Sequence, residues 1–148
     1  MLDKLQKGLN TKKTADITKS LTDAGILPTE HEEQTAFVSY FRKSFPTVRI
    51  IAIPNGGVRN KITALRLKCE GVSPGVPDLF IPEWFLFIEM KRRKGGTVSA
   101  EQKDWLEYLK TCGYKTVVAK GMDEAIKEAM ARKEEIAKWL CYQQGGTE

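Results

Sequence analysis

The chain has 148 residues, with 24 Lys plus Arg against 19 Asp plus Glu, and its net charge of +5 at pH 7 is compatible with a polyanionic partner without requiring one. This length lets one domain bury a core without disulfides or a structural metal. Three widely separated cysteines and a single histidine, His31, argue against a zinc site and give no sign of an oxidising compartment. No apolar run approaches the ~18 residues of a membrane span, and the first residues lack the apolar segment of a signal peptide. We therefore expect a cytoplasmic protein with no membrane partner.

The first third of the chain predicts an appendage followed by the start of a folded domain. Residues 1–28 are polar, with sparse Leu and Ile at helical spacing, and predict an N-terminal helical appendage. The domain itself is expected over residues 29–142. It opens with an amphipathic helix from Glu30 to Ser44, continues with a β-branched strand from Val48 to Ile53, and then reaches a loop signal at Pro54 to Gly57.

The rest of the chain alternates predicted helices and strands. A helix from Asn60 to Glu70 carries apolar residues on one face, and two strands, Asp78–Ile81 and Phe85–Lys91, are joined by a short hairpin-like connection. After them come a helix from Ser99 to Gly113, a strand from Lys115 to Ala119, a charged helix from Met122 to about Tyr142 and a frayed tail over residues 143–148. This order predicts an α/β fold with a mixed central sheet flanked by helices.

Charged residues bracket the apolar stretch GVPDLFIPEWFLFIEMK, where isolated charges in buried strands would be costly. Alternate residues of a strand share a face, so Glu89 and Lys91 are neighbours in space. If the preceding strand folds back antiparallel, Asp78 falls opposite Glu89 to within about one residue of register. Two carboxylates and an ammonium group then meet at one edge of the sheet.

This combination of groups favours chemistry on phosphate. Two neighbouring carboxylates repel each other, which raises a pKa unless a cation lies between them. Oxygen ligands without His or Cys suit Mg²⁺ or Mn²⁺. The lysine would orient an attacking water or stabilise charge that develops on phosphate. The set of groups therefore indicates metal-assisted hydrolysis of a phosphodiester.

The same residues resemble a known family. Pro77-Asp78, ten residues and then Glu89-Met90-Lys91 resemble the PD-(D/E)XK nuclease signature, and the wider text IPNGGVRNKITALRLKCEGVSPGVPDL and IEMKRRKGGTVSAEQKDWLEYLKTCGY looks like the stand-alone VRR-NUC branch found in bacteria and their phages. The resemblance covers about Glu30 to Ala129. It implies a restriction-endonuclease-like core and a DNA endonuclease that depends on Mg²⁺ or Mn²⁺. Asp78, Glu89 and the Met90 carbonyl would hold the metal, and Lys91 would position the water.

The resemblance also implies a site glutamate from the first helix and a site glutamine from a later one. Such enzymes carry a pattern like E-x-x-x-Q, which residues 30–34 supply, so Glu30 is the expected helix ligand and Glu33 the reserve. An acidic first turn that complements the helix dipole explains these glutamates equally well. Gln102 would lie beside the site, although with Ser99 it also forms a capping-box sequence.

Basic residues and glycines near the predicted strands are candidate DNA contacts. The cations that follow the catalytic strand could hold phosphates, a glycine-containing loop could let the backbone approach DNA closely, and the next helix is basic on its outer faces. A solvated loop, an ordinary turn and solubilising charges explain the same residues. The candidates are Asn55, Gly56, Arg59, Lys61, Arg66, Lys68, Arg92, Arg93 and Lys94.

Stand-alone members of the resembled family are thought to act as dimers on four-way (Holliday) junctions, so we expect a homodimer that prefers branched DNA, because paired sites match the symmetry of a junction. The appendage or the final helix could provide the contact between the two copies. The final helix carries apolar residues at helical spacings between Ala125 and Leu140. The alternatives are a non-catalytic nucleic-acid-binding module of the same fold and a general DNA endonuclease without junction preference. A small structural α/β protein would leave the alignment of Asp78, Glu89 and Lys91 as coincidence.

Overall fold

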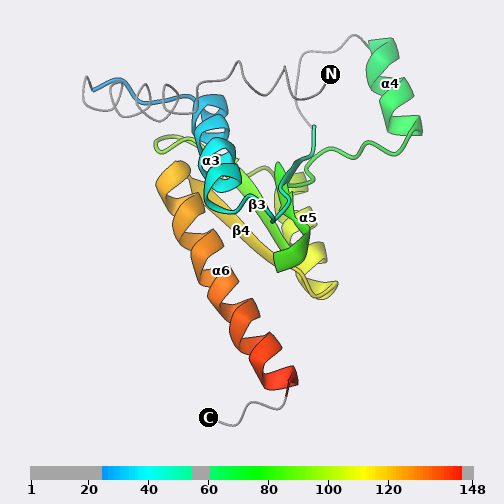
Figure 1. Cartoon of the computed structure of the whole chain (residues 1–148). Coiled ribbons are helices and arrows are strands. Elements are labelled where there is room, and N and C mark those ends of the chain that lie inside the picture. The colour runs from blue at the N-terminus through cyan, green and yellow to red at the C-terminus, as the bar shows by residue number, and fades with distance from the viewer. Residues whose placement is uncertain (1–24, 55–60, 145–148) are drawn as a thin grey trace, which may run out of the picture.

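The computed structural model describes residues 25–54 and 61–144. The predicted appendage, apart from its last four residues, therefore lies outside the described residues, as do Asn55, Gly56 and Arg59 and most of the predicted tail. The elements, labelled as in Figure 1, are α3 (Glu30–Ser44), β1 (Ile51–Ala52), α4 (Lys61–Cys69), β2 (Leu79–Ile81), the 3₁₀ helix η1 (Pro82–Trp84), β3 (Leu86–Lys91), α5 (Ala100–Thr111), β4 (Lys115–Lys120) and α6 (Met122–Gln143).

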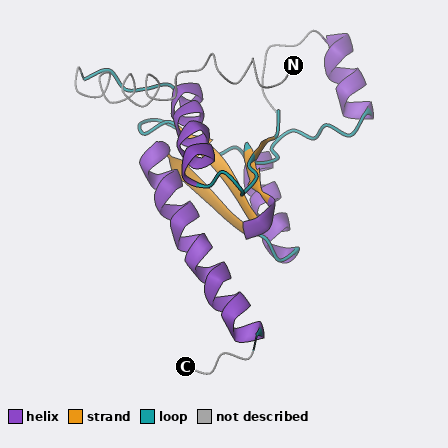
Figure 2. Cartoon of the chain, viewed as in Figure 1, coloured by secondary structure: helices purple, strands orange, loops and turns teal. Residues whose placement is uncertain are grey.

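The four strands form one mixed sheet, as predicted, and their order in it is β1-β2-β3-β4. β1 pairs antiparallel with β2 and β2 antiparallel with β3, whereas β3 and β4 are parallel and are joined through α5. Antiparallel neighbours can be linked by a tight turn, which η1 supplies here, but a parallel pair needs a longer crossover, which α5 supplies. The alternation of strands and helices thus produces the α/β fold (Figure 2).

Helices cover both faces of the sheet. α3 and α6 pack against each other and against β3 and β4, while α5 packs against β4 from the other side (Figure 1). The core between α3, α6 and the sheet contains Phe37 and Phe41 of α3, Ile88 and Met90 of β3, and Ala125 of α6. Alternate residues of β3 are thereby committed to this core, so the intervening residues face the side on which α5 lies.

The first helix has the predicted bounds because both of its ends are specified locally. Thr29 accepts a hydrogen bond from the Glu32 N–H at 3.2 Å, and the Glu32 side chain accepts from the Thr29 N–H at 2.7 Å, which completes a capping box. The helix stops at Ser44, two residues before Pro46, which cannot continue it. These signals hold the first turn of α3, and Glu30 with it, in a defined place.

The first strand is shorter than predicted, because β1 has only two residues instead of Val48 to Ile53. The Val48 N–H closes a turn on the Phe45 carbonyl at 3.1 Å, and the Arg49 N–H is directed to the Glu83 carboxylate at 3.3 Å. These amides are therefore unavailable to pair with β2. Beyond the strand, the Ile53 N–H still donates to the Asp78 carbonyl at 2.8 Å, which continues the pairing toward the candidate site.

The second predicted helix is present as α4, but its apolar face is exposed. Ile62 and Leu65 are 82% and 65% exposed, and α4 stands apart from the sheet in Figure 1. A nine-residue helix with few apolar side chains can bury little surface. The helical spacing of its apolar residues therefore predicted the helix but not its packing against the core. In the part of the chain that the structure describes, no helix is both long and apolar enough to cross a membrane.

Candidate active site

The structure brings Asp78, Glu89 and Lys91 together, as the sequence predicted. Leu79 pairs with Ile88, so continuing the antiparallel register by one residue places Asp78 opposite Glu89. Lys91 Nζ lies 2.7 Å from Glu89 Oε1, and both side chains are buried, Glu89 to 1% exposure. Glu89 and Lys91 are therefore buried between elements of the fold and do not form a solvated surface ion pair.

Proline shapes the end of the β2–β3 pairing. The same register continued by two residues places Pro77 opposite Met90, and proline has no amide hydrogen to donate to the Met90 carbonyl. The Met90 N–H donates instead to Asp78 Oδ2 at 2.8 Å. Because the carbonyl and the N–H of one strand residue point to the same side, the Met90 carbonyl faces the side on which the Asp78 carboxylate lies.

Gln102 reaches the cluster from the first turn of α5. Its Nε2 donates to Glu89 Oε1 at 2.5 Å, while its Oε1 accepts from the Ser99 N–H at 2.9 Å. Gln102 therefore completes a capping box, as its sequence context predicted, and also contacts Glu89. Gly75 permits this approach, because a Cβ there would lie 2.7 Å from the Glu101 backbone.

Burial shifts the pKa values of both carboxylates upward. For Glu89, burial is the largest cause and raises the pKa from 4.5 to about 7, with the neighbouring Asp78 raising it further and the Lys91 contact opposing the shift. Burial likewise raises the pKa of Asp78, against the hydrogen bond from Met90. The site therefore disfavours two bare negative charges and favours a cation or a proton.

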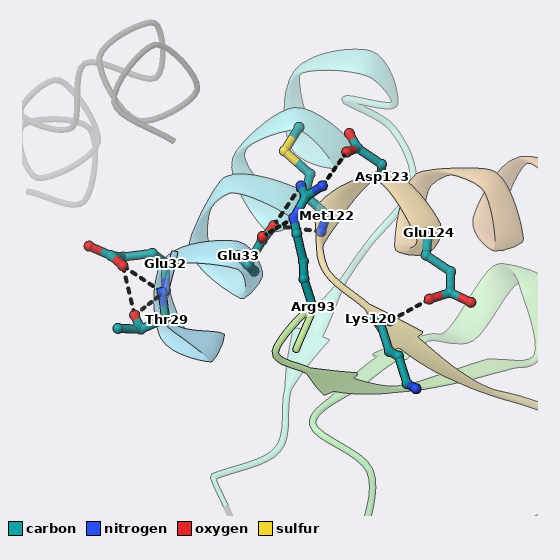
Figure 3. Close-up of polar contacts among 8 residues, drawn as sticks. All are labelled: Thr29, Glu32, Glu33, Arg93, Lys120, Met122, Asp123 and Glu124. Atoms are coloured by element: carbon teal, nitrogen blue, oxygen red, sulfur yellow. Dashed lines mark hydrogen bonds and ion pairs between the residues drawn. The ribbon is translucent and has the colours of Figure 1, made fainter. Parts of the chain in front are cut away.

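The helix glutamates separate into two environments. Glu30 has a side chain that is 41% exposed, and its Oε1 lies 3.9 Å from Lys91 Nζ, so it faces the cluster. Glu33 is fully buried and lies elsewhere: its carboxylate contacts Arg93 and the Met122 N–H (Figure 3). The geometry thus places the expected ligand, Glu30, next to the site and gives the reserve a different set of partners.

The predicted DNA contacts are scattered more widely. Arg92 and Lys94 are exposed just beyond β3, whereas Arg93 is partly buried and pairs with Glu33 at 2.5 Å and with Asp123 at 2.9 Å. Two further candidates, Arg66 and Lys68, are exposed on α4, and Arg66 also pairs with Glu70 at 2.7 Å. The side chain of Lys61 lies outside the described residues.

Sequence reasoning missed the partners of Glu33 and Arg93. The sequence did not predict the contacts with Asp123 and the Met122 N–H at the start of α6, because these groups are about 90 residues away from Glu33 in the chain. The only available signal was the acidic first turn of α6. That signal has an ordinary explanation in the helix dipole and names no partner.

The donor set fits a divalent ion that keeps several of its waters. Glu89 Oε1 accepts from Lys91 and Gln102, whereas Glu89 Oε2 is buried and has no hydrogen-bond partner among the residues that the structure describes. A buried oxygen without a partner is costly unless something else binds it. Within the described ranges no three His, Cys, Asp or Glu side chains gather closely enough to form a complete cage. Mg²⁺ is usually held by one or two carboxylates and retained water rather than by such a cage.

Comparison with known proteins identifies the family. The family model of the VRR-NUC domain matches residues 29–123, more than half of the chain. A solved structure described as a VRR_NUC domain protein is similar to this chain with a TM-score of 0.60 and 29% sequence identity, covering 71% of this chain and 88% of that one. No curated protein matches the chain. The mixed sheet, the carboxylate–lysine cluster and the family match agree: the chain belongs to the VRR-NUC domain family, and its function is of nuclease type.

Proposed function

We propose that the protein is a Mg²⁺- or Mn²⁺-dependent DNA endonuclease that hydrolyses phosphodiester bonds. The observation that carries the proposal is the buried, unpartnered Glu89 Oε2 beside Asp78, since this oxygen is directed to no donor of the described residues. A non-catalytic binding module has no need for buried carboxylates, which repel phosphate. The VRR-NUC membership supports the nuclease class independently.

Each group has a distinct role in holding the metal. Glu89 Oε2, the Asp78 carboxylate and the Met90 carbonyl would bind the ion, and the partly exposed Glu30 carboxylate would act through a water that the ion retains. Gln102 and Lys91 together fix the orientation of Glu89 by occupying its other oxygen. A bound ion would supply a more acidic water and would neutralise charge that develops on the phosphate.

Lys91 would be the group that acts on the reacting atoms. Its Nζ lies 2.7 Å from Glu89 Oε1 and 3.9 Å from Glu30 Oε1, so it could also donate to a water or to a phosphate oxygen that approaches beside Glu30. In the hydrolysis, a water oxygen bonds to phosphorus and loses a proton. The bond from phosphorus to the leaving sugar oxygen breaks, and that oxygen gains a proton.

The test is a cleavage assay with labelled duplex, flap and four-way-junction DNA in Mg²⁺, Mn²⁺ or EDTA. The proposal requires cleavage with one of the ions, none with EDTA, and none by Asp78→Asn with either ion. DNA binding without cleavage under every condition would identify the binding module instead. Cleavage that persists in EDTA would contradict the metal requirement.

The DNA strand would lie along the cations closest to the cluster. Arg92 and Lys94 follow Lys91 directly and are exposed, which suits contacts to phosphate that position the strand without reading its sequence. Arg66 and Lys68 on α4 are exposed candidates for a more distant contact. Each phosphate contact that is removed should reduce the salt dependence of binding by about one unit of slope.

We further propose a homodimer that prefers four-way junctions. The last turns of α6 run past the sheet in Figure 1, and Trp139, Leu140 and Tyr142 are exposed there, as are Ile62 and Leu65 on α4. Exposed apolar groups of this size favour association with a second copy. A two-fold dimer carries two sites, which matches the two symmetric nicks that resolve a junction.

Light scattering at micromolar concentration and mapping of cleavage positions test the assembly. The expected results are a dimer, and paired cuts at symmetry-related positions of an immobile junction in preference to linear duplex. A monomer that cuts duplex and junction equally would leave a general DNA endonuclease.

A further inference from the structure

An ion pair between the buried Glu33 and the partly buried Arg93 lies one helical turn away from the candidate site. Arg93 Nε and Nη2 donate to the two oxygens of Glu33 at 2.5 and 3.3 Å, and Glu33 Oε2 also accepts from the Met122 N–H at 2.7 Å (Figure 3). Arg93 Nη1 lies 2.9 Å from Asp123 Oδ2. One carboxylate and one guanidinium thus join α3, the segment after β3 and the start of α6.

Stability alone does not explain this pair. Glu33 is 0% exposed, and burying a carboxylate costs so much that apolar residues of similar volume often stabilise a protein equally well or better. An ion pair adds orientational specificity, because the planar guanidinium group can donate two hydrogen bonds to a carboxylate in only a few orientations. The pair therefore fixes how the three segments are oriented.

Two of these segments carry residues of the site. Glu30 precedes Glu33 by three positions, so the two side chains leave neighbouring points of the same helix face. Lys91 precedes Arg93 by two positions at the end of β3. The contact between Glu33 and Arg93 consequently joins the same two segments that carry Glu30 and Lys91. The side-chain atoms Glu30 Oε1 and Lys91 Nζ lie 3.9 Å apart.

The surroundings leave the pair little freedom. A Cβ at Gly121 would lie 2.9 Å from Arg93 Cγ and Nε and 3.2 Å from Glu33 Oε1, and Gly121 has a φ of +90°. The chain therefore approaches the pair as closely as glycine allows. A side chain at position 121 would therefore displace Arg93 or Glu33.

We propose that Glu33 and Arg93 are positioning residues of the catalytic centre: their contact locks the first turn of α3 against the end of β3 and so sets Glu30 across from Lys91. This inference rests on the proposed nuclease function for its effect on rate. Arg93, which the sequence suggested as a DNA contact, acts through Glu30 and Lys91 and not through phosphate.

The variant that tests this is the double substitution Glu33→Gln with Arg93→Met. The carboxamide can still accept from the Met122 N–H, and the methionine side chain fills the volume of the arginine stem. No buried charge is left unpaired, so the variant should fold, and thermal melting checks that it does. We expect kcat to fall about 100-fold, as for a displacement of about 1 Å at a reacting centre, with KM for DNA unchanged.

Three comparisons separate positioning from a merely structural or DNA-binding role. Adding Glu30→Gln to the double variant should cause little further loss of kcat, because Glu30 is already displaced. Arg93→Lys with Glu33 retained keeps the positive charge but not the paired guanidinium donors, and its kcat should lie between those of the double variant and the unmodified protein. In EDTA, the salt slope of DNA binding should equal that of the unmodified protein. Additive losses of rate, or a slope reduced by about one, would overturn the inference.

Arg132 provides the matched control, because it joins α6 to η1, which precedes the other end of β3. Its Nε donates to the Trp84 carbonyl at 2.8 Å, and its Nη1 pairs with Glu135 at 2.9 Å. Arg132→Met with Glu135→Gln should lower the melting temperature without changing kcat. An equal loss of kcat in this control would show that any loosening of α6 slows the enzyme.

A structural readout keeps the inference separate from the proposed function. Crystal structures of the unmodified protein and of the Glu33→Gln, Arg93→Met variant give the distance from Glu30 Oε1 to Lys91 Nζ, which is 3.9 Å here. We expect this distance to increase in the variant whether or not the protein cleaves DNA. An unchanged distance would overturn the inference, whereas a protein that neither cleaves DNA nor binds Mn²⁺ in calorimetry would overturn the proposed function alone.

Discussion

The side-chain amide of Gln102 donates to Glu89 Oε1 at 2.5 Å while the same side chain caps α5 by accepting from the Ser99 N–H. One residue thus couples the start of a helix to the orientation of a buried carboxylate. The two carboxylate oxygens of Glu89 thus differ, since within the described part of the chain Oε1 accepts from protein donors and Oε2 does not. A helix-capping residue can therefore act as an outer support of a metal ligand.

Two substitutions of Gln102 separate these tasks. Gln102→Glu retains a side chain that suits a capping box but presents a carboxylate to Glu89, so cleavage should fall while the melting temperature changes little. Gln102→Ala loses both contacts and should also destabilise the protein by about 1 kcal/mol. Rate measurements and thermal melting check both variants. Full cleavage by Gln102→Glu would reduce Gln102 to a capping residue.

Removing one carboxylate should separate catalysis from DNA binding. Asp78→Asn and Glu89→Gln each remove a negative charge near the path of the phosphates, so DNA binding should be unchanged or tighter while cleavage is lost. Cleavage assays and fluorescence anisotropy measure the two properties on the same preparations. Either variant cutting at the normal rate would remove that carboxylate from the mechanism.

The lysine should affect the rate more than the metal. Lys91→Ala leaves Asp78 and Glu89 Oε2 in place but removes the group next to the reacting phosphate, so kcat should fall by about two to three orders of magnitude. Calorimetric titration with Mn²⁺ should show a smaller loss of affinity than of rate, because Gln102 still donates to Glu89 Oε1. If the affinity falls as much as the rate, Lys91 serves mainly to hold Glu89 in place.

The two helix glutamates should respond differently to the same substitution. Glu30→Gln should slow cleavage and leave the melting temperature unchanged, because the Glu30 side chain is partly exposed and faces Lys91. Glu33→Gln should lower the melting temperature, because it weakens a buried pair and leaves the Arg93 charge less well compensated. A stability loss confined to Glu30→Gln would exchange the two assignments.

The sequence predicted those parts of the molecule that local rules determine. The bounds of α3 follow from its capping box and Pro46, and the meeting of Asp78 with Glu89 follows from strand alternation and a short connection between β2 and β3. The shortened β1 could not be predicted, because the Glu83 side chain that takes the Arg49 N–H comes from a distant position.

The same limit explains why the role of Glu33 was missed. Its partners lie 60 and 89 residues further along the chain, and they meet only after α3, β3 and α6 have packed. Charge pattern alone gave Glu30 and Glu33 similar standing, since both belong to one acidic first turn. Tertiary packing then directed one carboxylate to the site and the other into the interior.

The raised pKa of Glu89 predicts how the stability of the metal-free protein depends on pH. Burial raises this pKa from 4.5 to about 7, so the folded protein holds a proton that the unfolded chain releases. Stability from this group is therefore fully present below pH 4.5 and is lost as the pH rises through about 7. Glu89→Gln should remove this contribution, so the melting temperature of the variant should fall less between about pH 5 and about pH 8 than that of the unmodified protein.

Metal binding should reverse the loss, because a divalent ion takes the place of the proton between the carboxylates. At about pH 8, Mg²⁺ or Mn²⁺ should raise the melting temperature of the unmodified protein by more than it raises that of Glu89→Gln. Scanning calorimetry between about pH 5 and about pH 8, in EDTA and then with each ion, measures both effects. A melting temperature of the unmodified protein that is insensitive to the ions at the higher pH would contradict metal binding at Asp78 and Glu89.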